Sequence, residues 1–385
     1  MNSHTYYEWD FYPYEDSTIA ILVPLANFLN RVSTASRLCE APLAVIAITV
    51  NIFHVIVLSR KSMRVHCVNV IMIWIAINDM LTTGYSIHCL LAHSLPIFDE
   101  CIAPFSYTFA MWDQFVTVVD NSTRRLTAWF GFYMAALRLL ILKTALNAKF
   151  NFLSKTSFSI IVMAVSSVIS ILISLFFVLH IELVYFYDWV PPPECEDLFP
   201  ANFTKPYYGP TAREGFVSAW PVIVAMNFID GASRLIPTVL LPIFAYLLVR
   251  EINKARKRSK NLSSQSDQNK SDNTTKIVFL LALSFIITET PYGASYFLQA
   301  VGPLVSGVLN MFADIPYVVS SLVPIDSIVR CLLCLNLSTQ YRQTAETVLP
   351  CLSVFGKKTT NSVKVASTHG KSSVVSGKSM MSVVN

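Results

Sequence analysis

The sequence predicts an all-α membrane protein, in which a seven-transmembrane helix bundle is followed by a short C-terminal amphipathic helix. The chain is 54% hydrophobic and only 14% charged over 385 residues, and its mean hydropathy is +0.51. Apolar runs of about 20 residues, long enough to cross a membrane, can be drawn seven times. We expect these spans at about 41–58, 68–91, 109–142, 158–179, 220–249, 277–298 and 309–335.

The distribution of charge predicts the orientation of these spans. Arg60 and Lys61 follow the first run, and a basic stretch between 250 and 260 follows the fifth, whereas the N-terminal segment and the loop near 194–197 are acidic. Cytoplasmic loops are enriched in Lys and Arg, so the N-terminus is expected outside the plasma membrane and the C-terminus inside. No basic start followed by an apolar run marks a cleavable signal peptide, and the first span is expected to direct insertion.

We expect three parts along the chain. Residues 1–38 form an extracellular N-terminal segment, 39–350 the seven-transmembrane domain, and 351–385 a disordered cytoplasmic tail. The domain ends with an amphipathic segment at 338–349, which suits a helix lying on the inner membrane face. Cys351 follows this segment and is a candidate for palmitoylation.

Two of the eight cysteines fall in loops assigned to the oxidising outer side. Cys101 and Cys195 are therefore the natural disulfide partners, and Cys39 and Cys89, near the outer ends of the first two spans, are the competing partners. The bond would tether the long outer loop as a lid over the bundle.

That outer loop, at about 185–215, has two further signals. Three consecutive prolines at 191–193 favour an extended, stiff segment. Asn202 begins an Asn-Phe-Thr glycosylation sequon.

Three of the spans contain an acid and, four residues later, an arginine. The pairs are Asp120 and Arg124, Asp230 and Arg234, and Asp326 and Arg330. Residues four apart share a helix face and can neutralise each other. A charge near the bilayer centre costs at least roughly 2.5 kcal/mol, so these groups must face protein or water rather than lipid.

Two interpretations of the buried charges stay open. The pairs either neutralise one another for structural reasons, or they line a polar cavity in which a ligand binds. Arg125 follows the first pair and would belong to the same cavity. Glu289 lies one turn before Pro291, which bends a helix because it lacks a backbone N–H.

Nothing in the sequence indicates an enzyme, since it contains no phosphate loop, HExxH or nucleophile elbow. Cys331 and Cys334 have no second pair nearby to complete a zinc site, so we expect no metal and no cofactor. No nucleic-acid partner is expected. A transporter or channel would also use intramembrane charges, but inverted repeats with paired broken helices are not visible.

Residues in four of the spans occupy positions typical of one receptor superfamily. Asn51 lies in the first span, Asp79 in the second, Arg138 at the inner end of the third, and Phe285 six residues before Pro291 in the sixth. In this combination the chain resembles the rhodopsin-like G-protein-coupled receptors. More narrowly, the stretches Arg-Arg-Leu-Thr-Ala-Trp-Phe, Thr-Glu-Thr-Pro-Tyr-Gly and Cys-Leu-Leu-Cys resemble the nematode serpentine chemoreceptors of class W, which are similar to the FMRFamide-type peptide receptors.

The resemblance implies a receptor that binds an extracellular ligand and activates a heterotrimeric G protein. The ligand it implies is a peptide first and a small environmental molecule second. Further expected partners are membrane lipid and, through the tail, arrestin. The resemblance also implies that Asp79 meets Arg330 close to Asn51, where relatives often hold sodium. The residues it places around the ligand are Asp120, Arg124, Arg125, Asp230, Arg234 and Glu289.

Several family motifs are changed in this chain. The residue before Arg138 is not the family's Asp, and 330–334 stand at the positions of its Asn-Pro-x-x-Tyr. Glu289 replaces the usual Trp of the sixth span, and Asp113 replaces the disulfide cysteine at the start of the third. These departures concern the mechanics of activation rather than the fold.

Overall fold

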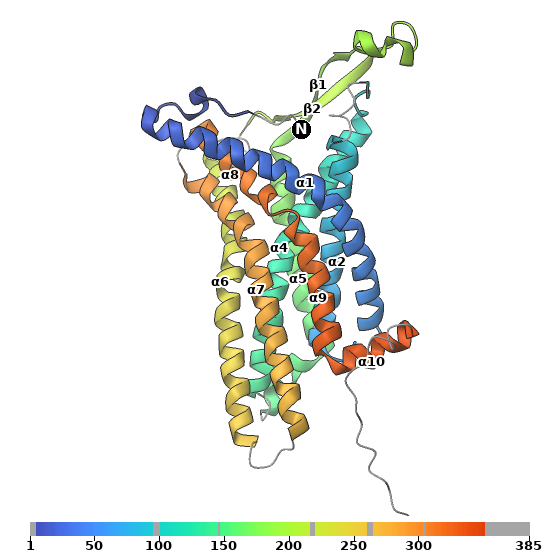
Figure 1. The fold of residues 1–385 in the computed structure, drawn as a ribbon, viewed down its shortest axis with the longest axis vertical. Helices are drawn as coiled ribbons and strands as arrows, with labels where there is room; N and C mark the ends of the chain where they lie inside the picture. The colour runs from blue at the N-terminus through green and yellow to red at the C-terminus, as the bar shows by residue number, and fades with distance from the viewer. Residues whose placement is uncertain are drawn as a thin grey trace, which may run out of the picture.

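The structure, a computed structural model, describes residues 5–94, 101–144, 147–215, 220–259, 265–302 and 305–350. Within these ranges six helical segments are long and apolar enough to cross a membrane. A further helix, α7, packs along α6 and completes the seven-transmembrane bundle (Figure 1). The bundle helices are α1 (Asp16–Leu58), α2 (Cys67–Cys89), α4 (Tyr107–Thr144), α5 (Thr156–Leu179), α6 (Trp220–Ser259), α7 (Gln265–Val301), α8 (Ser306–Val318) and α9 (Leu322–Leu337).

Apolar side chains fill the core of the bundle and also form much of its exposed surface. On α5, Ile161 and Leu172 are each 61% exposed. A surface of this kind is unfavourable in water but not in contact with lipid. The main core is formed by side chains from α1, α2, α4, α5, α6, α7, α9 and α10, among them Val57, Ile71, Phe130, Met163, Leu241, Leu281, Phe285 and Tyr341.

The first helix begins much earlier than expected. We predicted an extracellular segment at 1–38 and a span from about 41, but α1 starts at Asp16 and is continuous to Leu58. Its first part lies across the end of the bundle that carries the β-strands, before the helix turns along the others (Figure 1). We call this end the outer end and the end at α10 the inner end, after the orientation expected from the sequence. Small side chains, including Ala41, Ala44 and Ala47, face inward and allow close packing.

The N-terminal segment ahead of α1 packs against the outer end of the seventh span. η1 (Glu8–Phe11) is a short 3₁₀ turn that places the ring of Phe11 against Gly307 of α8. Tyr6 is buried beside it, and its hydroxyl donates to Asp314 of α8 at 2.9 Å. Burial and this hydrogen bond raise the pKa of Tyr6.

The seventh predicted span, 309–335, is two helices rather than one. α8 and α9 are separated by a short turn that includes Ser320 and Ser321. The hydroxyl of Ser36 on α1 accepts a hydrogen bond from the backbone N–H of Ser321 at 3.2 Å. Pro324 lies in the first turn of α9, where its missing N–H is tolerated, and this favours a new helix start there.

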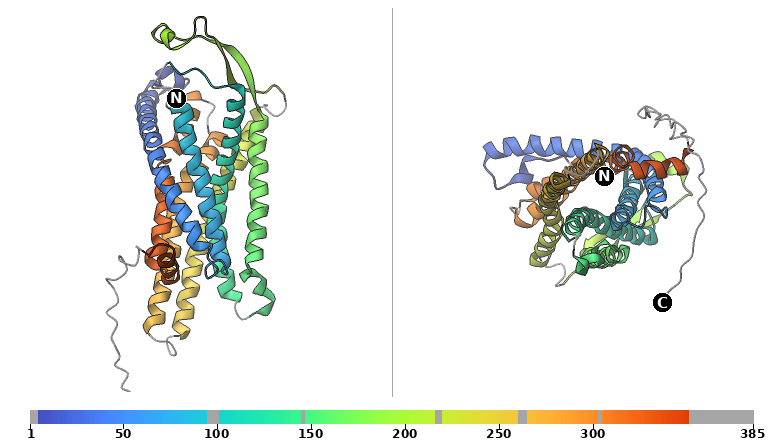
Figure 2. Two further views of the ribbon diagram at one scale, coloured as in Figure 1. Left: turned by 90° about the vertical axis from the view of Figure 1, so that its right-hand side faces the viewer. Right: turned by 90° about the horizontal axis from the view of Figure 1, so that it is seen from below.

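The long outer loop is a β-hairpin, which the sequence did not predict, although Pro192 has the expected extended backbone with a φ of −57° and a ψ of 154°. β1 (Ile181–Trp189) and β2 (Lys205–Ala212) are antiparallel, and their register pairs Ile181 with Ala212. Residues common in strands, such as Val, Ile, Tyr and Phe, fill β1. Pro193 begins η4 (Pro193–Leu198), a 3₁₀ helix at the end of the hairpin that projects from the bundle (Figures 1 and 2).

Cys101 and Cys195 form a disulfide with a Cα–Cα distance of 5.4 Å, which is the pairing favoured from the sequence. The competing partners, Cys39 and Cys89, are free thiols. Asn202 is exposed in the loop before β2 with a φ of 61°, a left-handed conformation that Asn tolerates.

The inner end of the bundle carries two short elements. η3 (Ala148–Ser154) follows α4, and α10 (Thr339–Val348) runs across the bundle axis below α9 (Figure 1). α10 agrees with the amphipathic helix expected at 338–349, and Ser338 caps its start by accepting from the backbone of Tyr341. The palmitoylation candidate Cys351 and the tail lie outside the described residues. At the outer end, η2 (Leu90–Ser94) extends α2 as a π-helical turn.

Candidate functional site

Buried charges in the outer half of the bundle come together from α1, α4, α6 and α7. We call this set the outer network; its members are Glu40, Asp120, Arg124, Arg125, Asp230, Arg234 and Glu289. All seven side chains are buried. Charged groups at this depth require partners, because their desolvation is costly.

The first part of the outer network is the expected pair on α4. The Nε of Arg124 donates to both carboxylate oxygens of Asp120 at 2.9 Å. Arg124 also lies 3.8 Å from Glu40 of α1, which accepts from the hydroxyl of Ser86. The face of the guanidinium lies 4.7 Å from the centre of the Tyr292 ring on α7. Arg124 therefore links three helices while keeping a partner on its own.

The second part joins α4 to α5 and α6. Arg125 is only 2% exposed; its Nε donates to Asp230 of α6 at 2.8 Å. Its Nη1 donates to the backbone carbonyl of Ser170 at 2.7 Å and to the hydroxyls of Ser170 and Ser174 of α5 at 2.9 and 3.2 Å. Asp230 also accepts from Arg234, four residues later on α6, at 3.2 Å. A single carboxylate thus neutralises two guanidinium groups.

Three polar atoms of the outer network have no hydrogen-bond partner among the described residues. They are Arg124 Nη1, Arg234 Nη1 and Glu289 Oε2. A buried polar atom without a partner costs about 1–3 kcal/mol, so such atoms are uncommon in native proteins and call for an explanation. Two unused donors and one unused acceptor can bind a group that offers both kinds of atom.

The outer network also has one more carboxyl group than guanidinium groups. It contains four carboxylates and three guanidinium groups, and each guanidinium group contacts an aspartate. Glu289 is 5% exposed and makes no ion pair with a described residue. The other three carboxyl groups of the outer network each lie within 4 Å of an arginine nitrogen, so Glu289 is the one without such a partner among the described residues.

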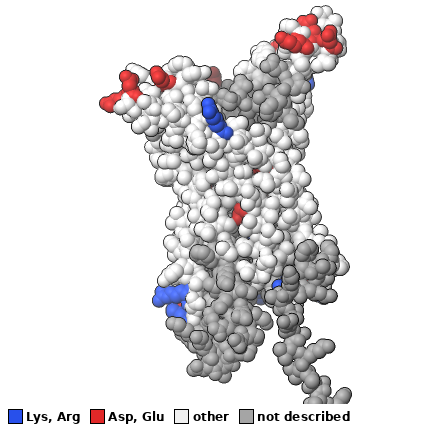
Figure 3. All heavy atoms as spheres, viewed as in Figure 1, with Lys and Arg blue, Asp and Glu red and all other residues white. Residues whose placement is uncertain are grey.

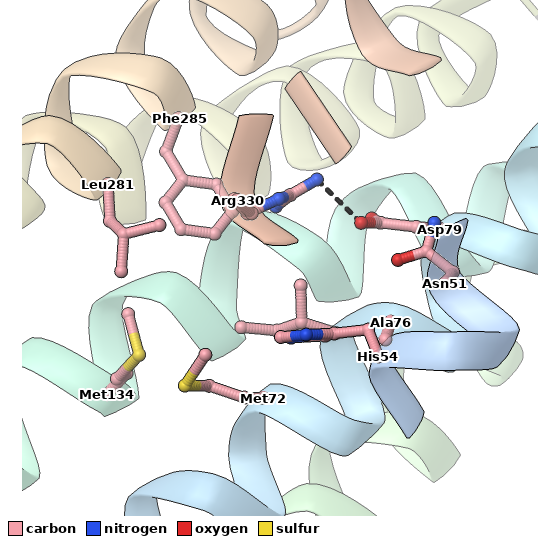
Figure 4. A pocket seen from close by; sticks show the side chains of 10 residues that line it. Asn51, His54, Met72, Ala76, Asp79, Met134, Leu281, Phe285 and Arg330 are labelled. Carbon is pink, nitrogen blue, oxygen red and sulfur yellow. Dashed lines mark hydrogen bonds and ion pairs between the residues drawn. The ribbon is translucent and has the colours of Figure 1, made fainter. Parts of the chain in front are cut away.

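A second set of charges lies deeper and is called the inner cluster. It consists of Asp79 on α2 and of Asp326 and Arg330 on α9. The Nη2 of Arg330 lies 2.7 Å from Asp79 and 3.1 Å from Asp326. The predicted meeting of Asp79 and Arg330 is confirmed (Figure 4).

The inner cluster borders a small cavity with room for about one water molecule. Asn51 lines it as predicted, and its amide donates to the backbone carbonyl of Ala47 at 2.9 Å and to the hydroxyl of Ser327. His54, a further lining residue, lies 2.7 Å from the hydroxyl of Tyr341 on α10. The cavity is therefore linked to the inner-face helix through one histidine.

Phe285 closes the cavity from α7 (Figure 4). Its ring lies 4.9 Å below the guanidinium of Arg330, a cation–π distance. The ring also packs close to Gly131 of α4, where a Cβ would lie 2.9 Å from it. Pro291 lies within α7 as predicted, between these contacts and the outer end.

Arg138 lies at the inner end of α4, below the cavity. Its Nη1 has no hydrogen-bond partner among the described residues, and it makes no ion pair with any of them. This agrees with the missing acidic neighbour in the sequence. The side chain is half-buried near Cys67 and Cys334.

The buried charges of both sets lie within the part of the chain that matches a known protein family. A family model described as serpentine type 7TM GPCR chemoreceptor Srw matches residues 39–352. The chain belongs to the Srw family. No curated protein matches it. Membership makes this Srw protein a seven-transmembrane chemoreceptor of the G-protein-coupled class rather than an enzyme, as expected from the sequence.

Some residues of the Srw receptor's charged sites were not predicted from the sequence. Glu40 was overlooked because it precedes the predicted first span, although an acid so close to an apolar run is a usable signal. Tyr292 and Tyr296 were overlooked as well; they lie four residues apart on α7 and stack on Arg124 and Arg234. Ser170 and Ser174 of α5 were not identified from the sequence either, yet their hydroxyls accept hydrogen bonds from Arg125.

Proposed function

We propose that this Srw receptor binds an extracellular peptide in the outer half of its bundle and activates a heterotrimeric G protein at the inner end. The observation that carries the proposal is the outer network, with unpartnered donors on α4 and α6 and an unpartnered acceptor on α7. A peptide offers backbone carbonyls, backbone N–H groups and charged ends, so it can satisfy both kinds of atom.

The proposal divides the outer network by role. Arg124, Arg234 and Glu289 contact the ligand, because each keeps an unpartnered atom. Asp120 orients Arg124, and the bond from Arg125 to Asp230 holds α4 against α6. A simple amine is a disfavoured ligand, because Asp120 is already paired with Arg124.

The orientation is part of the proposal. Acidic residues are visible on the two projections at one end of the bundle, and basic residues are visible between these projections and near the other end (Figure 3). The rule that positive loops stay inside then places the hairpin and N-terminus outside the plasma membrane and α10 in the cytoplasm. Asn202 would accept a glycan on the outer side.

Nucleotide exchange is the direct test. Membranes containing the receptor and a G protein are exposed to peptide and small-molecule libraries, and GTPγS loading is measured together with ion flux. Loading stimulated by a peptide supports the proposal. GTPγS loading that is stimulated only by a small environmental molecule would show that the ligand is not a peptide. Ion flux without GTPγS loading would indicate a transporter or channel instead.

Two substitutions test the site itself. Arg124→Gln and Glu289→Gln should each abolish the response to the peptide while the receptor still reaches the cell surface. The matched control is Arg213→Gln with Glu182→Gln, an exposed pair 3.6 Å apart at the base of the hairpin, which should leave the response unchanged. Retention of both site variants inside the cell would favour a purely structural role.

A further inference from the structure

A polar cleft lies at the inner end of the receptor, between the turn that follows α1 and the helix α10. It is shallow and broadly open to its surroundings. The residues that line it are Arg60, Lys61, Ser62, Gln343, Thr344 and Thr347. None of them is acidic or apolar, whereas most small-molecule pockets have apolar walls. The charged and hydrogen-bonding ends of these side chains suit an anion.

The two walls of the cleft are fixed to each other. Gln340 of α10 donates from Nε2 to the backbone carbonyl of Ser62 at 3.0 Å. On either side, Met63 and Tyr341 are buried in the main core. The turn is closed by a backbone hydrogen bond from Met63 to Arg60 at 2.8 Å. The cleft is therefore a formed feature of the fold rather than a gap between independent segments.

The charges of the cleft are available for binding. Arg60 and Lys61 are exposed, and neither makes an ion pair with a residue that the structure describes. The one acid on α10, Glu346, does not line the cleft. Two cationic side chains thus face hydroxyl and amide groups without a neutralising carboxylate in the lining.

The cleft also lies at a particular height. α10 runs across the bundle axis at its end (Figures 1 and 2), which is where the headgroups of the inner leaflet lie in the proposed orientation. Leu332 of α9 and Leu349 at the end of α10 are exposed apolar side chains that suit contact with acyl chains. A phosphate group carried by a lipid would therefore meet the cleft.

We propose that this cleft binds clustered phosphate groups, with an inner-leaflet phosphoinositide headgroup or a soluble inositol phosphate as the source. Arg60 and Lys61 supply positive charge, and Gln343 and Ser62 supply hydrogen-bond donors. The inference rests on the proposed orientation and not on the identity of the receptor's ligand. It assigns a specific site beyond the general attraction of basic segments to an anionic leaflet.

Binding is measured with the full receptor in phosphatidylcholine nanodiscs, titrated with a bisphosphorylated phosphatidylinositol. The double variant Arg60→Gln with Lys61→Gln should bind this lipid at least about tenfold more weakly. The matched control, Arg64→Gln with Lys149→Gln, removes the same charge from exposed inner positions outside the cleft and should change binding less than about threefold. Equal losses in the two doubles would overturn the proposal.

A substitution that does not change the charge distinguishes specific binding in the cleft from the attraction of basic residues to any anionic lipid. Gln343→Ala should weaken binding of the bisphosphorylated lipid about threefold. Binding of phosphatidylserine, compared at equal total lipid charge, should stay unchanged. Gln343→Ala also tests the cleft if the double variant fails to fold. No preference of the unmodified receptor for the bisphosphorylated lipid over phosphatidylserine would overturn the proposal.

The source of the phosphates is resolved with inositol trisphosphate on the detergent-solubilised receptor. Binding at the affinity of the lipid, lost in the double variant, supports a soluble ligand; much weaker binding supports the lipid. None of these measurements uses the extracellular ligand or a G protein. A failure here therefore leaves the proposed receptor function intact, and a failure of nucleotide exchange leaves the cleft intact.

Discussion

In the outer network, Arg125 of α4 finds its carboxylate on another helix, whereas in the inner cluster Arg330 keeps Asp326 on its own helix and meets Asp79 on α2. A partner four residues away follows its arginine when helices shift, but a partner on another helix does not. Asp230 is thus a fixed link between α4 and α6, and Asp79 is a link that α9 can release while Arg330 stays neutralised. The comparison predicts that the helices pack rigidly at the outer network and that the contact between Asp79 and Arg330 in the inner cluster can open and close.

The largest effect is expected from Asp230→Asn. This change leaves Arg125 and Arg234 buried with no carboxylate at hydrogen-bond distance and should destabilise the receptor by about 3–5 kcal/mol. Thermal unfolding of the purified protein and surface expression measure the loss. Asp120→Asn is the control, because Arg124 still has Glu40 nearby, and equal losses would contradict the distinction.

Two glycines extend the comparison to packing. A Cβ at Gly231, beside Asp230, would lie 2.6 Å from the backbone N of Phe297, whereas a Cβ at Gly131 meets the Phe285 ring at 2.9 Å. A ring can shift and a helix backbone cannot do so easily. Both Ala variants should lose about 1–3 kcal/mol, with Gly231→Ala the larger. The reverse order of unfolding temperatures would show that the inner contact is the more rigid one.

Arg330→Asn tests the movable contact. The change leaves the carboxylates of Asp79 and Asp326 beside a cavity that has room for a small ion, so sodium should replace the lost cation. Unfolding of the variant in sodium chloride, compared with choline chloride, should show about 1 kcal/mol of stabilisation when sodium exceeds its Kd about fivefold. The stability of the unmodified receptor should not depend on sodium, because the guanidinium of Arg330 already neutralises these carboxylates. A strong dependence on sodium would refute the idea.

The smallest effect is expected from Glu40→Gln. Arg124 keeps its close contact with Asp120, and the ion pair to Glu40 spans 3.8 Å. The amide of Gln can still accept from Ser86, so the loss should stay within about 1 kcal/mol. A loss as large as that of Asp230→Asn would make α1 part of the rigid region.

The features that were predicted correctly from the sequence are mostly local or follow from the family pattern. The pairing of Asp120 with Arg124 depends only on the helical repeat, and the apolar runs identify the spans by length alone. The contact between Asp79 and Arg330 required the resemblance, because nothing in a single sequence brings α2 to α9. The link from Arg125 to Asp230 depends on how α4 and α6 face each other, which local spacing does not determine.

Other features were missed because one signal outweighed another. The prolines at 191–193 favour an irregular extended segment, whereas the Val, Ile, Tyr and Phe residues of β1 favour a strand. The first signal was given more weight, so the hairpin was not predicted. Asp16 to about residue 40 lacks a clear apolar period, since small residues rather than large ones face the bundle there. The part of the expected N-terminal segment from Asp16 onward was therefore separated from the first span, although the two form one helix.

The contact between Tyr6 and Asp314 joins residues 308 positions apart and has a consequence for biosynthesis. A ribosome delivers the N-terminal segment and α1 first and α8 near the end. The backbone of Tyr6 can therefore pair with Asn27 of α1 early, whereas its hydroxyl has no Asp314 to bind until almost the whole chain has been made. Docking of this segment on α8 would then be among the last steps of assembly, and it would mark a chain whose seventh span has been inserted.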